Sequence, residues 1–531
     1  MEVSTMPRPL PDRPDLDHLK TQAKSLLRAA RDGDTTAIHR FAILPAFSAK
    51  PPAQWPVTDL ALHDAQSVVA REHGFVSWNA LREEVEARTL TFAAASDEFI
   101  RCATGGASGR AERLLALHPR IASSSLYAAI VLGDADAVGA RLQAHPELAT
   151  RADGPQKDWE PLHYACHTCL CGRDESKLEG LVAIARQLCA LGANANGEYH
   201  WNWHPELPRT VLWGAVCAVS YLPLAEVLLE AGAAPTDGVS AHIAGGGGNI
   251  AALELLHRYG LRADGIPGGV PPLVHTMLWA TNPAGPRWLL EHGADANLAW
   301  GLDEEGPLHV AARRWDVAMV DALMSHGADL HRRRKDGRTP HALAELHGNR
   351  EVADRLLALG AHDELSSLDR FVAACARGDR RDAASMLEAQ PSLRDELSPE
   401  HHRLLHRPAE SGDTAALEAM LTSGFDPDAR DQDNVTPLHR AAMGGHPDAA
   451  RVLIAHGADV DALDGMFSAS PLVWAVEGRG HAAPGSDHVG VARILIDAGC
   501  SLEWEPPPGA PDQERTFERL IDLRRAALEP A

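Results

Sequence analysis

Apolar and polar positions follow the period of two short helices between residues 434 and 463. Leu438 and Ala441 recur at helical spacing, and Pro437 precedes them at a first-turn position, where the missing N–H of proline is harmless. A second apolar face follows, and Gly457 can take the left-handed conformation that ends a helix. The stretch therefore predicts two helices joined by a Gly-Gly-His turn.

The same pattern returns along most of the chain. Gly-Ala pairs at the ends of second helices begin at Gly293, Gly327 and Gly360, spaced 34 and 33 residues apart. A fixed period of this size is typical of stacked repeats, in which each unit buries its apolar face against its neighbours. Degenerate copies extend the pattern from about residue 92 to residue 502.

The best-formed copy resembles the ankyrin-repeat family. Its residues Thr436-Pro437-Leu438-His439 match the opening motif of the family, and Gly457-Ala458-Asp459 match the end of the second helix. In that family a repeat has about 33 residues, with a β-turn and two helices. The resemblance implies an all-α ankyrin-repeat solenoid of about twelve helix-turn-helix repeats with helical N- and C-terminal caps.

Four segments follow from this pattern. Residues 1–15 are rich in proline and predict a flexible tail, while residues 16–90 have helical periodicity without the motif and predict an N-terminal cap. The ankyrin-repeat solenoid is expected over residues 91–504. Residues 505–531 are expected to form a linker and a C-terminal capping helix, because solenoids need atypical ends to shield their core.

The charge of the chain narrows its expected partners. With 50 Lys and Arg against 73 Asp and Glu, the formal net charge is −23, which disfavours nucleic acid and anionic membranes as partners.

No run of about 18 apolar residues predicts a membrane span, and the N-terminus lacks the apolar core of a secretory signal. The 8 Cys have no spaced framework and are expected to be reduced, as in a cytoplasmic protein. The excess of arginine over lysine favours a bacterial source.

The resemblance also implies which side chains contact a partner. Ankyrin proteins bind through their hairpin tips and the concave faces of their first helices. The matching positions of this sequence, together with a Trp- and His-rich hairpin between repeats three and four, give the candidate partner-binding residues: Tyr164, His167, Trp201, Trp203, His204, His275, Trp279, Arg313, Arg440, Trp474 and Glu477.

Aromatic and histidine side chains are densest between residues 159 and 213. The chain has 12 Trp against 9 Phe and 5 Tyr, and tryptophan combines apolar area with a polar atom, as binding hot spots do. Two interpretations stay open for this cluster. It forms a recognition surface, or a long hairpin buries its own tryptophans against the stack.

A zinc site is a further hypothesis for the same stretch, where His163, Cys166, His167, Cys169 and Cys171 are close in sequence. The spacing of the last two cysteines is tight for one tetrahedral ion, and His163 and Cys166 fall on positions that face the stack. The sequence therefore predicts no metal and no cofactor.

Three further motifs have structural interpretations. His309, His406 and His439 share the histidine position of the motif, which in this family hydrogen-bonds backbone between repeats. The glycine run 245–248 lacks the Lys-Ser/Thr of a phosphate-binding loop, so it is expected to open a depression on the concave face or to relieve crowding. The basic tip 332–335 is expected to be a solvated loop.

These observations favour a non-enzymatic scaffold that recognises a protein partner through the concave groove and the hairpin tips. The partner's contact patch is expected to be basic or mixed, complementing the acidic chain. The alternative is an enzyme or small-molecule binder with a Trp- and His-lined pocket in the concave face around repeats three to seven. No catalytic residues can be assigned, because acid–base and nucleophilic roles depend on distances. An open groove would favour the scaffold, and an enclosed pocket the alternative.

Overall fold

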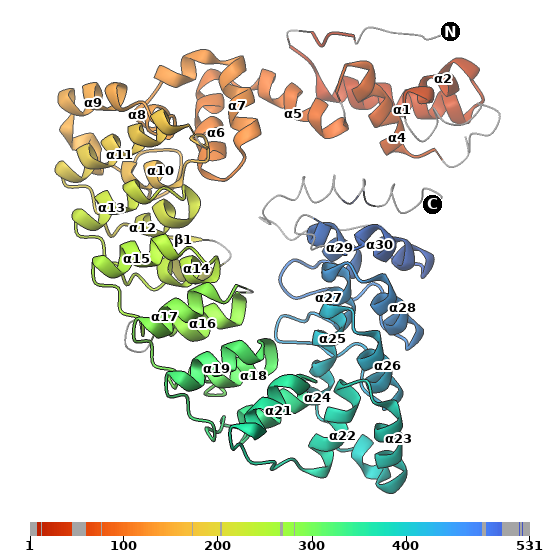
Figure 1. The fold of residues 1–531 in the computed structure, drawn as a ribbon. Helices are drawn as coiled ribbons and strands as arrows, with labels where there is room; N and C mark the ends of the chain where they lie inside the picture. Colours follow the sequence, from red (N-terminus) through yellow and green to blue (C-terminus); the bar gives the residue numbers. More distant parts are fainter. Residues whose placement is uncertain are drawn as a thin grey trace. The chain divides into compact units, whose positions relative to one another are not determined.

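The computed structural model describes residues 8–11, 13–44, 60–75, 77–172, 174–201, 204–265, 269–280, 282–479, 485–501, 520 and 523. The chain divides into two compact units, residues 1–288 and 289–531. Helices make up nearly all of the regular structure (Figure 1), which confirms the predicted all-α class. None of the described helices is long and apolar enough to cross a membrane.

The first unit begins with a group of helices that has its own core. A buried cluster extends from Leu19 to Val85 within this group. The side chain of Asp15 accepts hydrogen bonds from two backbone N–H groups of the first turn and so begins the first helix. The separate core agrees with a helical segment over residues 16–90, whose role as a cap remains a prediction. The helices are α1 (Leu16–Arg31), α2 (Thr35–Arg40), η1 (Phe41–Ile43), α4 (Leu62–Glu72) and α5 (Trp78–Thr89).

Helix pairs form the rest of the first unit, and the first helices of neighbouring pairs pack on one another. The one two-stranded sheet among the described residues is antiparallel, with Glu198 opposite Thr210. The pairs are α6 (Phe92–Thr104) with α7 (Ser108–Leu117), α8 (Leu126–Val131) with α9 (Ala135–Ala144), α10 (Pro161–His167) with α11 (Glu175–Ala190), α12 (Val211–Trp213) and the π turn η6 (Gly214–Ala218) with α13 (Leu222–Glu230), α14 (Ser240–Gly246) with α15 (Ile250–Arg258), and α16 (Pro272–Trp279) with α17 (Ala284–Glu291); between them lie η4 (Pro119–Ser123), η5 (Pro146–Thr150), β1 (Glu198–Trp201) and β2 (His204–Thr210).

The second unit continues the same pattern, with first helices stacked on first helices and second helices on second helices. Its core also includes Leu520 and Leu523, which are all that is described of the predicted C-terminal capping helix. The pairs are α18 (Pro307–Arg314) with α19 (Val317–Ser325), α20 (Pro340–Leu346) with α21 (Arg350–Ala358), α22 (Ser367–Ala376) with α23 (Arg380–Ala389), α25 (His406–Ser411) with α26 (Thr414–Thr422), α27 (Pro437–Gly444) with α28 (Pro447–Ala455), and α29 (Pro471–Arg479) with α30 (His488–Asp497); η7 (Pro391–Arg394), α24 (Pro399–His402) and η8 (Arg403–Leu405) precede α25.

The turn between the two helices of a repeat requires glycine where neighbouring repeats come close. Gly445 follows α27 with a φ of 70°, in the left-handed region that other residues rarely adopt. A Cβ on this residue would also lie only 2.8 Å from the ring of His488 in the next repeat. Backbone conformation and close packing therefore both select glycine here.

Histidine side chains connect one repeat to the next. The Nδ1 of His439 accepts a hydrogen bond from the N–H of Thr436 (3.2 Å), and its Nε2 donates to the carbonyl of Ala469, just before the next first helix (3.0 Å). The Nε2 of His309 bonds the carbonyl of Arg332 at 3.1 Å, and that of His406 bonds the carbonyl of Ala429 at 2.9 Å. The predicted structural role of these three histidines is confirmed.

We predict that His439→Ala lowers the free energy of unfolding by about 2–4 kcal/mol, because it leaves a buried N–H and a buried carbonyl without partners. Urea unfolding of the full chain measures this loss. The control is His456→Ala in the same repeat, where the histidine is exposed and the change should stay within about 0.5 kcal/mol. Equal losses in the two variants would contradict the proposed bridge.

Candidate functional site

Aromatic rings cluster around α10 in the first unit. The ring of Trp159 lies 5.3 Å from Tyr164, 5.0 Å from His167 and 4.7 Å from Tyr199, measured between centroids. Trp159, Tyr164 and His167 are all buried. Of the two open interpretations, self-packing therefore describes these side chains, which support the hairpin that begins with Glu198.

Two residues of the candidate set lie inside this cluster rather than on a surface. Tyr164 is fully buried, and its hydroxyl accepts a hydrogen bond from the N–H of Gln156 (2.9 Å). The Nδ1 of His167 donates to the carbonyl of His163 at 2.8 Å. Burial lowers the pKa of His167 to about 3, so the ring is neutral at physiological pH. Neither side chain is exposed to a partner in this arrangement.

The hairpin between repeats three and four is described only in part. Trp201 ends β1 and pairs in backbone register with His204, the first residue of β2. Their side chains lie outside what the structure describes, and Trp203 lies outside the described residues altogether. The predicted contacts of these three residues therefore remain predictions.

Repeats five and six present an apolar surface on their first helices. Trp279, at the end of α16, is 73% exposed, and Ile243 of α14 is 44% exposed. A Cβ added at Gly246 would meet no atom within 4 Å, whereas one at Gly245 would lie 2.8 Å from the hydroxyl of Thr276, so the glycine run leaves space at Gly246 and relieves crowding at Gly245. His275, which is partly exposed, stacks on the buried His242 with ring centroids 4.5 Å apart. Trp279 is thus an accessible member of the candidate set.

Several first helices of the second unit carry arginine or tryptophan side chains. Arg313 forms two hydrogen bonds with Glu305, at 2.9 and 2.8 Å. Arg440 pairs with Asp431 at 3.0 Å, and its guanidinium lies 5.6 Å from the centre of the Trp474 ring. The indole N–H of Trp474 in turn donates to Asp464 at 2.6 Å, which fixes the ring. Glu477 is partly exposed on the same helix, α29.

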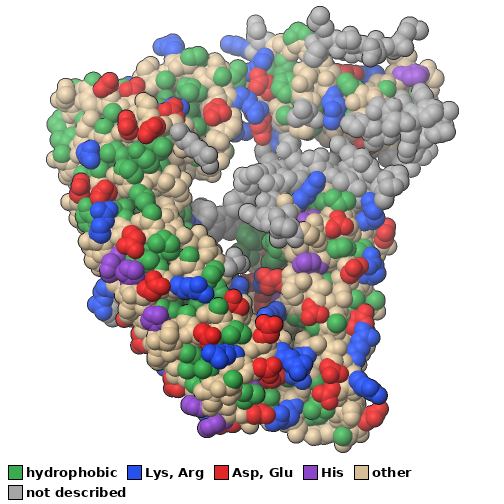
Figure 2. Space-filling model, in the orientation of Figure 1, with side chains coloured by type: hydrophobic (Ala, Val, Ile, Leu, Met, Phe, Trp, Pro, Cys, Tyr) green, Lys and Arg blue, Asp and Glu red, His purple; other side chains and the backbone are tan. Residues whose placement is uncertain are grey.

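Arg407 is not among the candidate residues, although it also lies on a first helix of the second unit. It lies in α25, where it donates a hydrogen bond to the backbone carbonyl of Arg313. The sequence does contain a signal for it, because Arg407 follows His406 as Arg440 follows His439. Positively and negatively charged side chains are interspersed over this unit (Figure 2).

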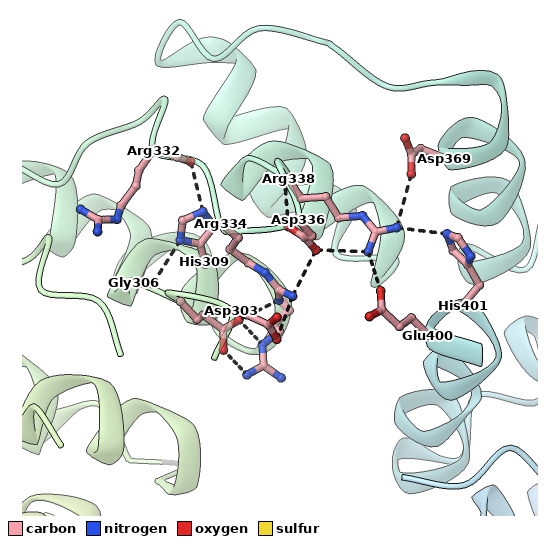
Figure 3. A network of polar contacts seen from close by, with 12 residues as sticks. Asp303, Gly306, His309, Arg332, Arg334, Asp336, Arg338, Asp369, Glu400 and His401 are labelled. Atoms are coloured by element: carbon pink, nitrogen blue, oxygen red, sulfur yellow. Dashed lines mark hydrogen bonds and ion pairs between the residues drawn. The ribbon is translucent and has the colours of Figure 1, made fainter. Parts of the chain in front are cut away.

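Hairpin tips of the second unit are joined by ion pairs (Figure 3). Arg334 pairs with Asp303 at 3.3 Å and with Asp336 at 3.2 Å. Arg338 continues the network, with Asp336 at 3.4 Å and the Nε2 of His401 at 3.1 Å. The expectation of a solvated basic tip is therefore wrong for Arg334, whose side chain is only 15% exposed.

Cavities and metal ligands give little sign of a small-molecule site in the described part of the chain. Two cavities there hold about 160 and 150 Å³, below the roughly 300 Å³ at which ligand pockets begin. Neither is lined by a residue of the candidate set. Among the described residues, no three His, Cys, Asp or Glu side chains are placed to hold a metal ion.

Comparison with known proteins agrees with this architecture. The ankyrin-repeat family, "Ankyrin repeats (3 copies)", matches residues 279–366 and 405–503. The helix pairs of residues 279–366 and 405–503 are thus ankyrin repeats, and the fold is an all-α ankyrin-repeat solenoid.

Two curated relatives are similar to parts of the chain. The 2-5A-dependent ribonuclease of Mus musculus is 49% identical over 61 residues, which are 11% of this chain and 8% of that protein. A Caenorhabditis elegans homologue of transient receptor potential cation channel subfamily A member 1 is 30% identical over 128 residues, 24% of this chain and 10% of that protein. The chain thus spans a tenth or less of the length of these relatives.

We predict that acidification destabilises the fold through its buried histidines. Burial lowers the pKa of His309 and of His439 to about 4, against about 6.5 in an unfolded chain. Between these values the unfolded state binds more protons, so stability falls as the pH falls from about 6.5 towards 4. Urea unfolding should show that the free energy of unfolding falls by about 2 kcal/mol per histidine between pH 7 and pH 5. NMR titration of the imidazoles would show whether these histidines cause the loss. A stability that is flat or higher at pH 5 would contradict this.

We also predict opposite outcomes for two members of the candidate set. Tyr164→Ala should cost about 3–5 kcal/mol of stability, because it removes a fully buried ring. Trp279→Ala should change stability by no more than about 0.5 kcal/mol, since its ring is mostly exposed. Thermal and urea unfolding measure the stability of both variants. A large loss of stability in Trp279→Ala would mean that the Trp279 ring is packed in solution.

Proposed function

We propose that the chain is a non-enzymatic scaffold that binds a protein partner through its first helices and hairpin tips. Ankyrin repeats generally mediate protein–protein interaction, and the family match covers two segments of this chain. The observation that carries the proposal is the exposed Trp279 next to the glycine-rich α14. Large exposed apolar side chains are typical of binding surfaces, where tryptophan is over-represented among the residues that dominate affinity.

Within this proposal the candidate residues have two roles. The accessible ones, Trp279, Arg313, Arg440, Trp474 and Glu477, would contact the partner. Tyr164 and His167 would instead hold the hairpin of repeats three and four in place. None of the 8 cysteines, all of which are described, forms a disulfide bond in this fold, and this is compatible with a reducing compartment such as the cytoplasm. The segments 1–15, 16–90, 91–504 and 505–531 remain the proposed division into tail, cap, solenoid and C-terminal cap.

The test is capture of a partner with the full chain, followed by a binding measurement with the purified pair. We expect one protein recovered in stoichiometric amount by the wild type and lost in Trp279→Ala. Calorimetry should give a dissociation constant that is about 10–100-fold weaker for this variant, as expected for a hot-spot residue.

A matched control is Leu357→Ala, since Leu357 is 39% exposed but lies on a second helix, α21. Its affinity should equal that of the wild type. If no stoichiometric partner is recovered, or if both variants bind as the wild type does, the proposed surface is wrong.

A further inference from the structure

The first helices of repeats four to six carry no charged side chain. Residues 210–220, 239–249 and 271–282, which include these helices, contain no Asp, Glu, Lys or Arg, although 23% of the chain is charged. Their two histidines add no charge at physiological pH, because burial lowers the pKa of His275 to about 4 and also lowers that of His242. Three successive repeats therefore have uncharged first helices.

The charged side chains just before two of these helices are already engaged. Arg209 lies over the ring of Trp213, 3.8 Å from its centre. Asp237 accepts hydrogen bonds from the hydroxyls of Thr210 and Ser240, at 2.6 Å each. Both charges are thus used within the stack, at the starts of repeats four and five.

The three first helices lie side by side. Helix α14 packs against both η6 of repeat four and α16 of repeat six. Side chains at the same motif positions therefore form one continuous face across the three repeats. Its main exposed or partly exposed members are Ala218, Ile243, Gly246, Gly247, His275 and Trp279, and they are called the uncharged strip below.

Large apolar side chains of the uncharged strip face solvent. Trp279 is 73% exposed and Ile243 is 44% exposed. On the same face of α14 as Ile243, Gly246 leaves open space, where a partner's side chain can enter. The equivalent positions of repeats seven and eleven hold Arg313 and Arg440, so an uncharged face is not a general property of the repeat.

The uncharged strip offers few hydrogen-bonding groups to an occupant. Only two of its side chains, the imidazole of His275 and the indole of Trp279, contain a polar atom. An extended segment would bring N–H and C=O groups that need partners, and the strip cannot supply them in number. A helix bonds its own backbone groups. The strip therefore favours a helical occupant.

The length of the uncharged strip matches a helix of moderate length. Neighbouring helices pack about 8–10 Å apart, so three of them with their side chains span about 25 Å. A helix that rises about 1.5 Å per residue covers this length with about 17 residues.

We propose that the uncharged strip docks an amphipathic helix of a protein partner. The apolar face of that helix would pack on Trp279 and Ile243, with one side chain entering above Gly246. This face is uncharged, because a charge buried against the strip would find no ionic partner among its side chains. The outer face of the helix is basic, which complements a chain with a net charge of −23. The inference rests on the proposed scaffold function and gives the chemistry of its partner.

The experiment is fluorescence anisotropy of the full chain with a labelled helical peptide of about 18 residues, with leucines on one face and lysines on the other. The control peptide has the same composition in scrambled order and so has no apolar face. We expect the amphipathic peptide to bind about 10-fold more tightly or better. Its binding should persist in about 1 M salt, where the Debye length is about 3 Å, while that of the scrambled peptide should be lost.

Ile243→Glu separates apolar docking from charge attraction. A carboxylate at this position would strengthen a purely electrostatic attraction for the lysines. It should instead weaken the docking of the amphipathic peptide about 10-fold or more, because the charge would be buried against leucines. Gly246→Glu should weaken binding as well, since its side chain would fill the open space of the strip. Trp279→Ala should weaken binding by removing the largest contact.

The control variant is Leu357→Glu, since Leu357 is 39% exposed and lies on a second helix, α21. Its affinity for the amphipathic peptide should not fall below that of the wild type. Circular dichroism and melting temperatures establish that each variant is folded. If Ile243→Glu fails to fold, Gly246→Glu carries the test, because a Cβ at Gly246 meets no atom within 4 Å.

Several results would overturn the inference. They are equal binding of the two peptides, loss of amphipathic-peptide binding at high salt, and unchanged or tighter binding in Ile243→Glu. Binding of neutral phosphatidylcholine vesicles that is lost in Ile243→Glu would assign the uncharged strip to a lipid surface instead. Self-association that disappears in Gly246→Glu would make the occupant a second copy of this chain.

The outcome is separable from that of the scaffold proposal. A captured partner that depends on Trp279, together with a silent amphipathic peptide and an unchanged affinity in Gly246→Glu, would refute the helical occupant and leave the scaffold function intact. A peptide that binds and is weakened by Ile243→Glu, while no partner protein is captured, would support the uncharged strip and contradict the scaffold proposal.

Discussion

Buried imidazole rings between neighbouring repeats are the interaction on which the stack depends. A repeat of two short helices cannot bury enough apolar surface to be stable alone, so it needs its neighbours. In His439 one ring nitrogen satisfies the helix start of its own repeat, and the other satisfies a carbonyl of the next. Each ring thereby fixes the position of one repeat on another, and the surface side chains of both repeats are held in register.

The repeated motif made most of the fold predictable, because its residues have strictly local reasons for their positions. The histidine of the motif bonds forward to the next repeat in His309, His406 and His439, and in His309 and His439 it also accepts from the helix start. The sequence predicts Tyr164 at a binding surface, but its side chain is buried. The motif gives the position of a residue in its helix and does not show which side chains pack beside it. The ring of Tyr164 lies 4.7 Å from that of Tyr127, a tertiary fit that spacing does not reveal.

The arrangement of charges was the least predictable part. The sequence predicts a solvated Arg334, yet the neighbouring hairpin brings Asp303 to it, and Asp336 of its own tip also pairs with it. The approach of Arg407 to the end of α18 depends on how the repeats between them curve, and sequence period alone does not contain that curvature. A surface assembled from several repeats is therefore visible only once the repeats are placed in space.

The forward direction of the histidine bridges has a consequence for how such an array can change its length. Inserting one complete repeat preserves every bridge, because the new repeat brings both an imidazole and an acceptor carbonyl. An insertion of half a repeat would bury an imidazole without its acceptor carbonyl, or the carbonyl without the imidazole. The repeats that start at Thr339 and Ser470 have Ala342 and Val473 at the histidine position, so their first helices donate no such bridge. Duplication of whole repeats therefore keeps each imidazole together with its acceptor.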